Sequence, residues 1–186
     1  MKQQSQIQIP RFAKRIARLS NETDRKLEAL SLRLGVSTNS ILEKAVRRYV
    51  EWEVFAEGVG LVQVPPSLYK TLMNHLTDEE ARNIGKQSGN DASIEFIRGY
   101  FHKFDLESLL ESFRVIGDEF MHAFKYNEFS ENPQRTIMLR HNAGPRVSAY
   151  YSEVLKALCS QLNIGVEVHE SETQITATIG KHDLKP

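Results

Sequence analysis

The chain has 186 residues, of which 40% are hydrophobic and 26% charged, and its formal charge at pH 7 is zero. This length accommodates one domain and a smaller second one, and the composition is typical of a globular protein. A single cysteine, Cys159, excludes an internal disulfide framework and a cysteine metal cluster. No apolar run approaches the roughly 18 residues of a membrane span, and the polar N-terminus is not a signal peptide, so we expect a cytoplasmic protein.

The neutral total conceals two halves of opposite charge. Residues 1–50 contain eleven Lys or Arg and four Asp or Glu, a formal charge of +7, so residues 51–186 have −7. Such asymmetry indicates that the basic half contacts nucleic acid. The alternative is a helical hairpin with ordinary solvated charges.

The basic half begins with an expected flexible arm, residues 1–13, followed by a short basic strand over residues 14–19. Leucines at helical spacing predict a first helix over residues 21–34, which Gly35 ends as a left-handed cap. Ser37 is placed to cap a second helix, which continues to about residue 55. The unit ends near Gly58, so we assign residues 14–58 to one domain.

A lone six-residue strand leaves its backbone N–H and C=O groups unpaired. The economical solution is antiparallel pairing between two copies of the chain, which builds a homodimer with a two-stranded basic ribbon. A β-ribbon of this kind fits the DNA major groove.

The stretch from Arg15 to Val50, RIARLSNETDRKLEALSLRLGVSTNSILEKAVRRYV, resembles the ribbon-helix-helix family of DNA-binding proteins. The most specific part is the turn LGVSTNS followed by the alternating apolar and basic helix ILEKAVRRY. The resemblance covers about a quarter of the chain and implies a dimer that reads double-stranded DNA with its paired strands. It implies phosphate binding by the N-terminus of the second helix, and the residues expected at the DNA are Lys14, Arg15, Ile16, Arg18, Ser37, Thr38 and Asn39.

The register of the strand stays open at this point. Counting back from Leu19, the alternation directs Lys14, Ile16 and Arg18 outward and places Arg15 inside. A slip of one residue reverses these assignments, so Arg15 then faces the groove.

Residues 61–186 predict an α+β domain with a small, mostly antiparallel sheet covered by helices. Thr77 is expected to cap one of these helices, and the last two strands are expected to form a hairpin. The predicted strands are residues 61–64, 135–141, 166–169 and 174–179, and the predicted helices are residues 68–76, 78–87, 92–104, 106–124 and 146–162.

No catalytic pattern accompanies this domain, so we expect neither an enzyme, nor a metal, nor a cofactor. Cys159 lies on the apolar side of a helix, as a packing residue does. A polar cluster of Arg140, His141 and Arg146 flanks a helix start, where N–H groups attract anions; the alternative is a basic surface loop. The dense aromatic residues on the helices are mostly core, but such a domain can also enclose a small ligand.

The sequence therefore predicts a homodimeric or higher oligomeric transcription regulator, such as a repressor, with a C-terminal domain for ligand sensing or oligomerisation. An antitoxin of a toxin–antitoxin pair is one alternative, although such tails are typically short and disordered. A plasmid partition or conjugation accessory protein is another.

Overall fold

The computed structural model describes residues 15–131 and 134–180. The chain divides into two compact units, with the boundary between Glu51 and Trp52. Residues up to Glu51 are called unit 1 below, and residues from Trp52 onward are called unit 2.

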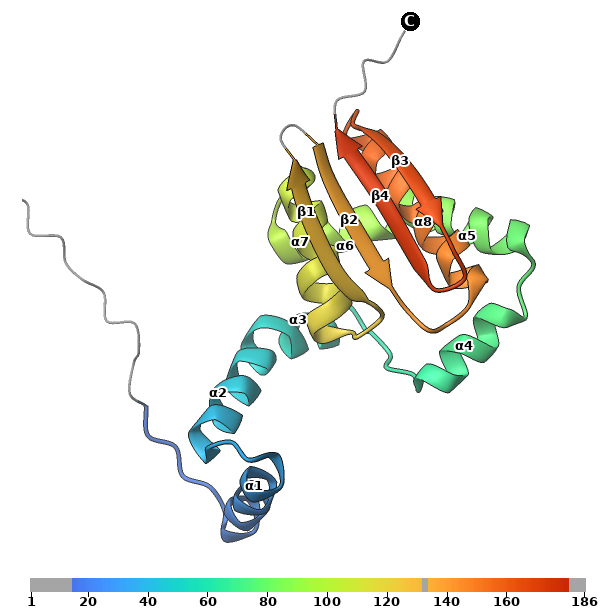
Figure 1. Ribbon diagram of the computed structural model, residues 1–186. Helices are drawn as coiled ribbons and strands as arrows, with labels where there is room; N and C mark the ends of the chain where they lie inside the picture. The colour runs from blue at the N-terminus through green and yellow to red at the C-terminus, as the bar shows by residue number, and fades with distance from the viewer. Residues whose placement is uncertain (1–14, 132–133, 181–186) are drawn as a thin grey trace, which may run out of the picture. The chain divides into compact units, whose positions relative to one another are not determined.

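Unit 1 is a helical hairpin whose helices begin where the sequence predicts. α1 (Asn21–Leu34) is capped by the hydroxyl of Ser20, and α2 (Thr38–Arg48) by that of Ser37. Gly35 ends α1 with φ at 66°, the left-handed conformation that a residue without a Cβ adopts at little cost. The first helix, its cap and the turn are thus confirmed (Figure 1).

The hairpin buries none of the residues in its two helices. Leu27 and Leu30 of α1 and Ile41 and Leu42 of α2 are only half-buried. The large apolar side chains that are exposed in unit 1 are Ile16, Leu19, Leu32, Leu34, Val36, Val46, Tyr49 and Val50. The described residues of unit 1 therefore form no closed core in a single chain.

Residues 15–20 have no regular secondary structure, so the strand expected over residues 14–19 is not formed in the single chain. A strand requires a neighbour for its backbone N–H and C=O groups, and within the described residues this segment pairs with none. Residues 1–14, which include the expected arm and Lys14, lie outside the described residues. The single chain thus forms the helical hairpin, and the ribbon remains an inference about two chains.

The second helix of unit 1 continues without a break into unit 2. α2 passes into a π-helix, η1 (Tyr49–Glu53), and then into α3 (Val54–Gly58). The helix therefore runs about three residues further than the sequence predicts. Trp52 is buried and Phe55 packs beside it, and both residues belong to unit 2.

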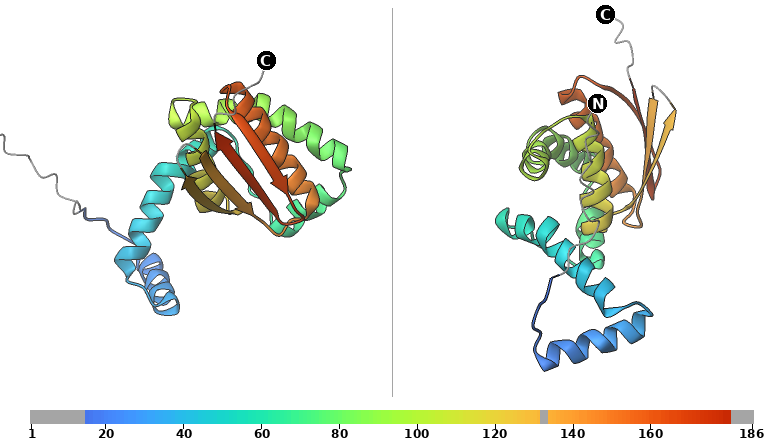
Figure 2. Two further views of the ribbon diagram at one scale, coloured as in Figure 1. Left: turned by 45° about the horizontal axis from the view of Figure 1, so that its top comes forward. Right: turned by 90° about the vertical axis from the view of Figure 1, so that its left-hand side faces the viewer.

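Unit 2 is an α+β domain in which helices cover one face of a four-stranded sheet. In Figure 2 the right-hand view shows the strands nearly edge-on, with the helices of this unit on one side. The helices are α4 (Pro66–Asn74), α5 (Asp78–Asn90), α6 (Ala92–Phe101), α7 (Leu106–Glu111), the π-helix η2 (Ser112–Phe120) and α8 (Pro145–Gln161). The strands are β1 (Lys125–Glu131), β2 (Gln134–Arg140), β3 (Gly165–Glu170) and β4 (Gln174–Gly180).

The sheet has the order β1-β2-β4-β3, and every neighbouring pair is antiparallel (Figure 1). β2 and β4 are its central strands, with Ile137 opposite Ala177 and Leu139 opposite Ile175. Their side chains alternate between buried and half-buried, which is the pattern of a sheet packed on one face. The predicted small antiparallel sheet is thus confirmed.

The main core lies between this sheet and the helices α6, α7, η2 and α8. Its fully buried side chains include Leu109, Leu155 and Leu158, together with Cys159. Cys159 is therefore a packing residue, as expected. A second cluster surrounds Trp52.

Two strand assignments from the sequence are wrong. Residues 61–64 form no strand, and Val62 is 82% exposed because no strand lies beside the segment. Pro65 and Pro66, which follow, lack the N–H that a ladder needs. Conversely, β1 was missed because its sequence, KYNEFSE, is rich in residues that strands usually disfavour.

Candidate nucleic-acid interface

The residues expected to read DNA bases lie before α1. Arg15, Ile16 and Arg18 are all exposed, Ile16 at 89%. The ion pairs described within unit 1 join Lys26 to Glu22 and Arg47 to Glu51, so they leave the charges of Arg15 and Arg18 unpaired within the described residues. Both guanidinium groups are thus available to an external partner.

The turn between the helices is fixed by three hydrogen bonds. The N–H groups of Gly35 and Val36 both donate to the carbonyl of Ser31, at 2.9 and 3.3 Å. The hydroxyl of Ser31 donates to the carbonyl of Val36 at 2.6 Å. The start of α2 therefore has a defined direction relative to α1.

The first turn of α2 presents backbone donors. The hydroxyl of Ser37 accepts the N–H of Ser40 at 3.1 Å, and its carbonyl accepts that of Ile41 at 3.2 Å. Helix geometry leaves the N–H groups of Thr38 and Asn39 without a partner four residues earlier, and the helix dipole makes this end positive. Such a terminus suits a phosphate oxygen. The three predicted phosphate residues thus lie together at one helix end.

The residues of the predicted anion cluster in unit 2, Arg140, His141 and Arg146, form hydrogen bonds with different partners. Arg140 donates to the side chain of Asn127 at 3.0 Å. Arg146 donates to the carbonyl of Leu76 and to Asp78, each at 3.1 Å, so its charge is paired.

His141 does not add a positive charge to that cluster when its imidazole is neutral. Its Nε2 lies 3.0 Å from the hydroxyl of Ser148, and its Nδ1 accepts the N–H of Ala143 at 3.3 Å. Burial lowers the pKa of His141 below its usual value, which favours the neutral imidazole at pH 7. Arg140 and His141 border a surface hollow of about 300 Å³ that does not include Arg146 among its lining residues.

Part of the exposed apolar surface of unit 1 was not expected from the sequence. Leu32 is 85% exposed and lies off the stripe formed by Leu27, Leu30 and Leu34. Val36, in the turn, is also exposed. A leucine outside the apolar stripe of an amphipathic helix is the signal that marks this second apolar surface.

Within residues 15–131 and 134–180, no helix combines the length and the apolar character that crossing a bilayer requires. The same residues contain no group of three or more His, Cys, Asp or Glu side chains placed to hold a metal ion. A scan against models of known protein families finds no match for this chain, and a search of curated proteins finds no similar sequence.

Proposed function

We propose that this protein is a DNA-binding transcription regulator whose unit 1 forms a ribbon-helix-helix dimer. The observation that supports the proposal most directly is the absence of any buried residue in α1 and α2, although both helices are well capped.

A hairpin of this kind requires a partner. Fully burying a Leu or Val side chain is worth about 1.5–3 kcal/mol, and isolated helices of this length are marginal in water. Leu32, Val46 and Val50 are 85%, 61% and 68% exposed in the single chain. Covering these three alone would therefore contribute several kcal/mol.

A second copy of the same unit is the partner that also pairs the N-terminal segment. Two antiparallel copies of residues 15–19 provide each other with ladder hydrogen bonds. The resulting ribbon displays two rows of alternating side chains. In one register Arg18 faces outward with Ile16, and in the other Arg15 does.

Charge favours DNA as the ligand of this dimer. Residues 1–50 have a formal charge of +7, which two copies double. Arginine binds guanine through two hydrogen bonds, and the N-terminus of α2 supplies N–H groups for a phosphate. The acidic unit 2, at −6 over residues 52–186, is then kept off the DNA.

The test starts from a pool of random duplexes, from which the full-length protein should enrich a two-fold symmetric sequence. On that sequence Arg18→Ala should lose roughly 1–3 kcal/mol of binding free energy and relax specificity at one base. Arg15→Ala determines the strand register, because a larger loss of binding for Arg15→Ala than for Arg18→Ala would show that the strand is shifted by one residue. Lys86→Ala, which removes one charge from α5 of unit 2, is the matched control.

Three results count against the proposal: no enriched sequence, equal losses for the control and both unit 1 variants, or a unit 1 that folds as a monomer. A folded unit 2 with its own core does not favour an antitoxin with an unfolded tail. Plasmid partition and conjugation accessory proteins would share the DNA contacts and differ in the location of the enriched sequence.

A further inference from the structure

Unit 2 contains a pocket of about 310 Å³ that is open to solvent and lined mainly by residues of α5, α6, η2 and α8, and it is called the cavity below. Phe96 and Ile97 of α6 and Phe113 and Ile116 of η2 form much of its apolar wall. The described residues that line it include no charged side chain. The volume lies at the lower end of small-molecule sites, roughly 300–1,000 Å³.

One side of this cavity is polar. The hydroxyl of Ser88 on α5 lies 3.0 Å from the hydroxyl of Tyr150 on α8 and 3.2 Å from that of Ser93 on α6, and all three residues line the cavity. Two hydrogen bonds within the cluster use two of its three protons. The cluster therefore retains one donor and several acceptor lone pairs for a further partner.

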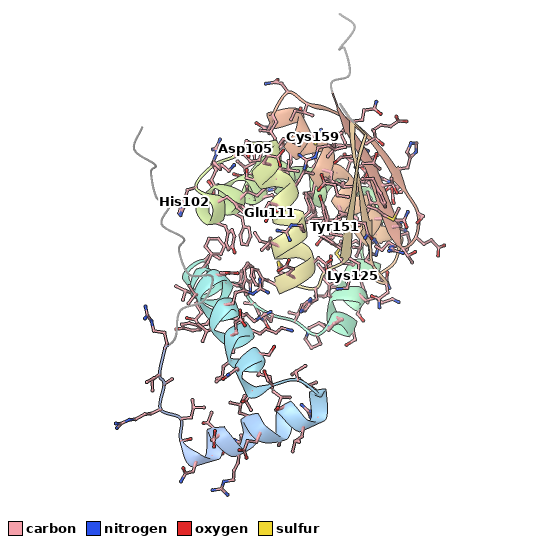
Figure 3. The ribbon with its side chains drawn as sticks, turned by 60° about the vertical axis from the view of Figure 1, so that its left-hand side comes forward. His102, Asp105, Glu111, Lys125, Tyr151 and Cys159 are labelled. Atoms are coloured by element: carbon pink, nitrogen blue, oxygen red, sulfur yellow. The ribbon has the colours of Figure 1, made fainter. Side chains whose placement is uncertain are left out.

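Tyr151 of the cavity wall and its neighbour Tyr69 are neutral at pH 7. Tyr151, which also lines it, lies between η2 and the sheet in Figure 3 and shares a hydrogen bond with Tyr69. Burial raises the pKa of Tyr69 to about 12 and that of Tyr151 well above its usual value. A charged ligand would thus lose its hydration without gaining an ionic partner.

The cavity wall also contacts the single tryptophan of the chain. η2 is a π-helix of nine residues, and such helices are rare and often found at functional sites. It places Ile116 at the cavity and Phe120 against Trp52, with the two rings stacked at 5.3 Å. Phe96 lines the cavity and meets the ring of Trp52 edge-on, with the ring centroids 6.3 Å apart.

We infer that this cavity binds a neutral, largely apolar small molecule with one hydrogen-bonding group. The apolar body lies against Phe96 and Ile116, and the polar group joins the hydroxyl cluster of Ser88 and Tyr150. Trp52 immediately follows the last residue of unit 1. The role of the ligand as an effector rests on the proposed function, whereas its binding does not.

Three probes that share one skeleton test the chemistry on the full-length protein without DNA. These are 3-cyclohexylpropan-1-ol, propylcyclohexane and 3-cyclohexylpropanoate, none of which absorbs in the range of tryptophan. Binding is measured by calorimetry and by the fluorescence of Trp52. The alcohol should bind one molecule per chain, and the carboxylate should bind roughly tenfold or more weakly.

Two variants locate the site. Ser88→Ala should lower the affinity for the alcohol roughly three- to ten-fold and leave the affinity for the hydrocarbon unchanged. Val154→Phe, which adds volume at a buried lining residue, should abolish binding of both, with retained folding verified by circular dichroism. Ser67→Ala on α4, outside the cavity lining, is the matched control for Ser88.

The inference is overturned if the alcohol shows no saturable binding, if the carboxylate binds as tightly, or if neither Ser88→Ala nor Val154→Phe changes the affinity. Because no DNA is present, these outcomes are independent of whether unit 1 binds an operator.

Discussion

Gly85 permits the closest approach between two helices of unit 2. A Cβ added to Gly85 of α5 would lie 2.3 Å from the backbone oxygen of Tyr150 on α8. One turn later, a Cβ at Gly89 would lie 2.8 Å from the backbone oxygen of Val154. Since a helix carbonyl cannot rotate away, Gly85→Ala should force α5 and α8 apart by about 1 Å, a shift that tight packing resists.

The expected loss follows from two opposing effects. Overpacking of this kind costs about 1–3 kcal/mol, and alanine gains about 1 kcal/mol over glycine inside a helix. Because the obstacle is backbone, the cost should lie near its upper limit, so Gly85→Ala should lower the free energy of unfolding by about 2 kcal/mol. At Gly99 of α6 the nearest atom is Cε2 of Phe55 at 3.4 Å, so Gly99→Ala should instead raise it by up to about 1 kcal/mol.

Urea unfolding followed by the fluorescence of Trp52 measures both variants. Trp52 is the single tryptophan of the chain and is 2% exposed within unit 2, so its emission reports the unfolding of this unit. The two substitutions should move the urea midpoint in opposite directions. A Gly85→Ala protein that unfolds at the wild-type midpoint or above would show that α5 and α8 are not in backbone contact.

Three further predictions concern local chemistry. Ser37→Ala should lower the stability of the hairpin by about 1 kcal/mol, seen as lost helicity on heating, whereas Ser37→Asp should retain the cap. Cys159 is fully buried and its pKa is raised to about 11, so Ellman's reagent at pH 8 should modify it slowly in the native protein and rapidly in urea; equal rates would contradict its burial. The N–H of Ser108 and, to a lesser degree, Lys103 lower the pKa of Asp105 from 3.8 to about 2, so this carboxylate stabilises unit 2 above about pH 4 and less as the pH falls toward 2. Asp105→Asn should therefore show a smaller decrease of the urea midpoint over that interval, and an unchanged decrease would exclude the effect.

Many local features of this structure were predicted from short stretches of the sequence. The caps at Ser37 and Thr77 and the left-handed Gly35 each depend on residues within four positions, and all three were predicted. The hairpin of β3 and β4 followed from alternation and a short connection. Such features can be read from the sequence because their partners lie within the same short segment.

The features that were missed have two different causes. β1 pairs with β2, which begins only three residues after β1 ends, but it was missed because its own residues do not favour a strand. The other features depend on partners that are distant in the chain. Arg146 was expected to meet an anion, but the fold places it against Asp78 of α5. The hydroxyl cluster likewise joins Ser88 to Tyr150, on helices that no local pattern connects.

The order of the sheet has a consequence for the proposed assembly. Its two edge strands, β1 and β3, offer unpaired backbone groups, yet both bear charged side chains, among them Lys125 and Glu128 on β1 and Glu167 and Glu170 on β3. Charges on an edge strand discourage its pairing with another chain. If two copies pair as proposed, their backbone pairing is therefore expected at residues 15–19 and not at the edges of the sheet, and dimers crowded together would not be expected to merge into a continuous intermolecular sheet.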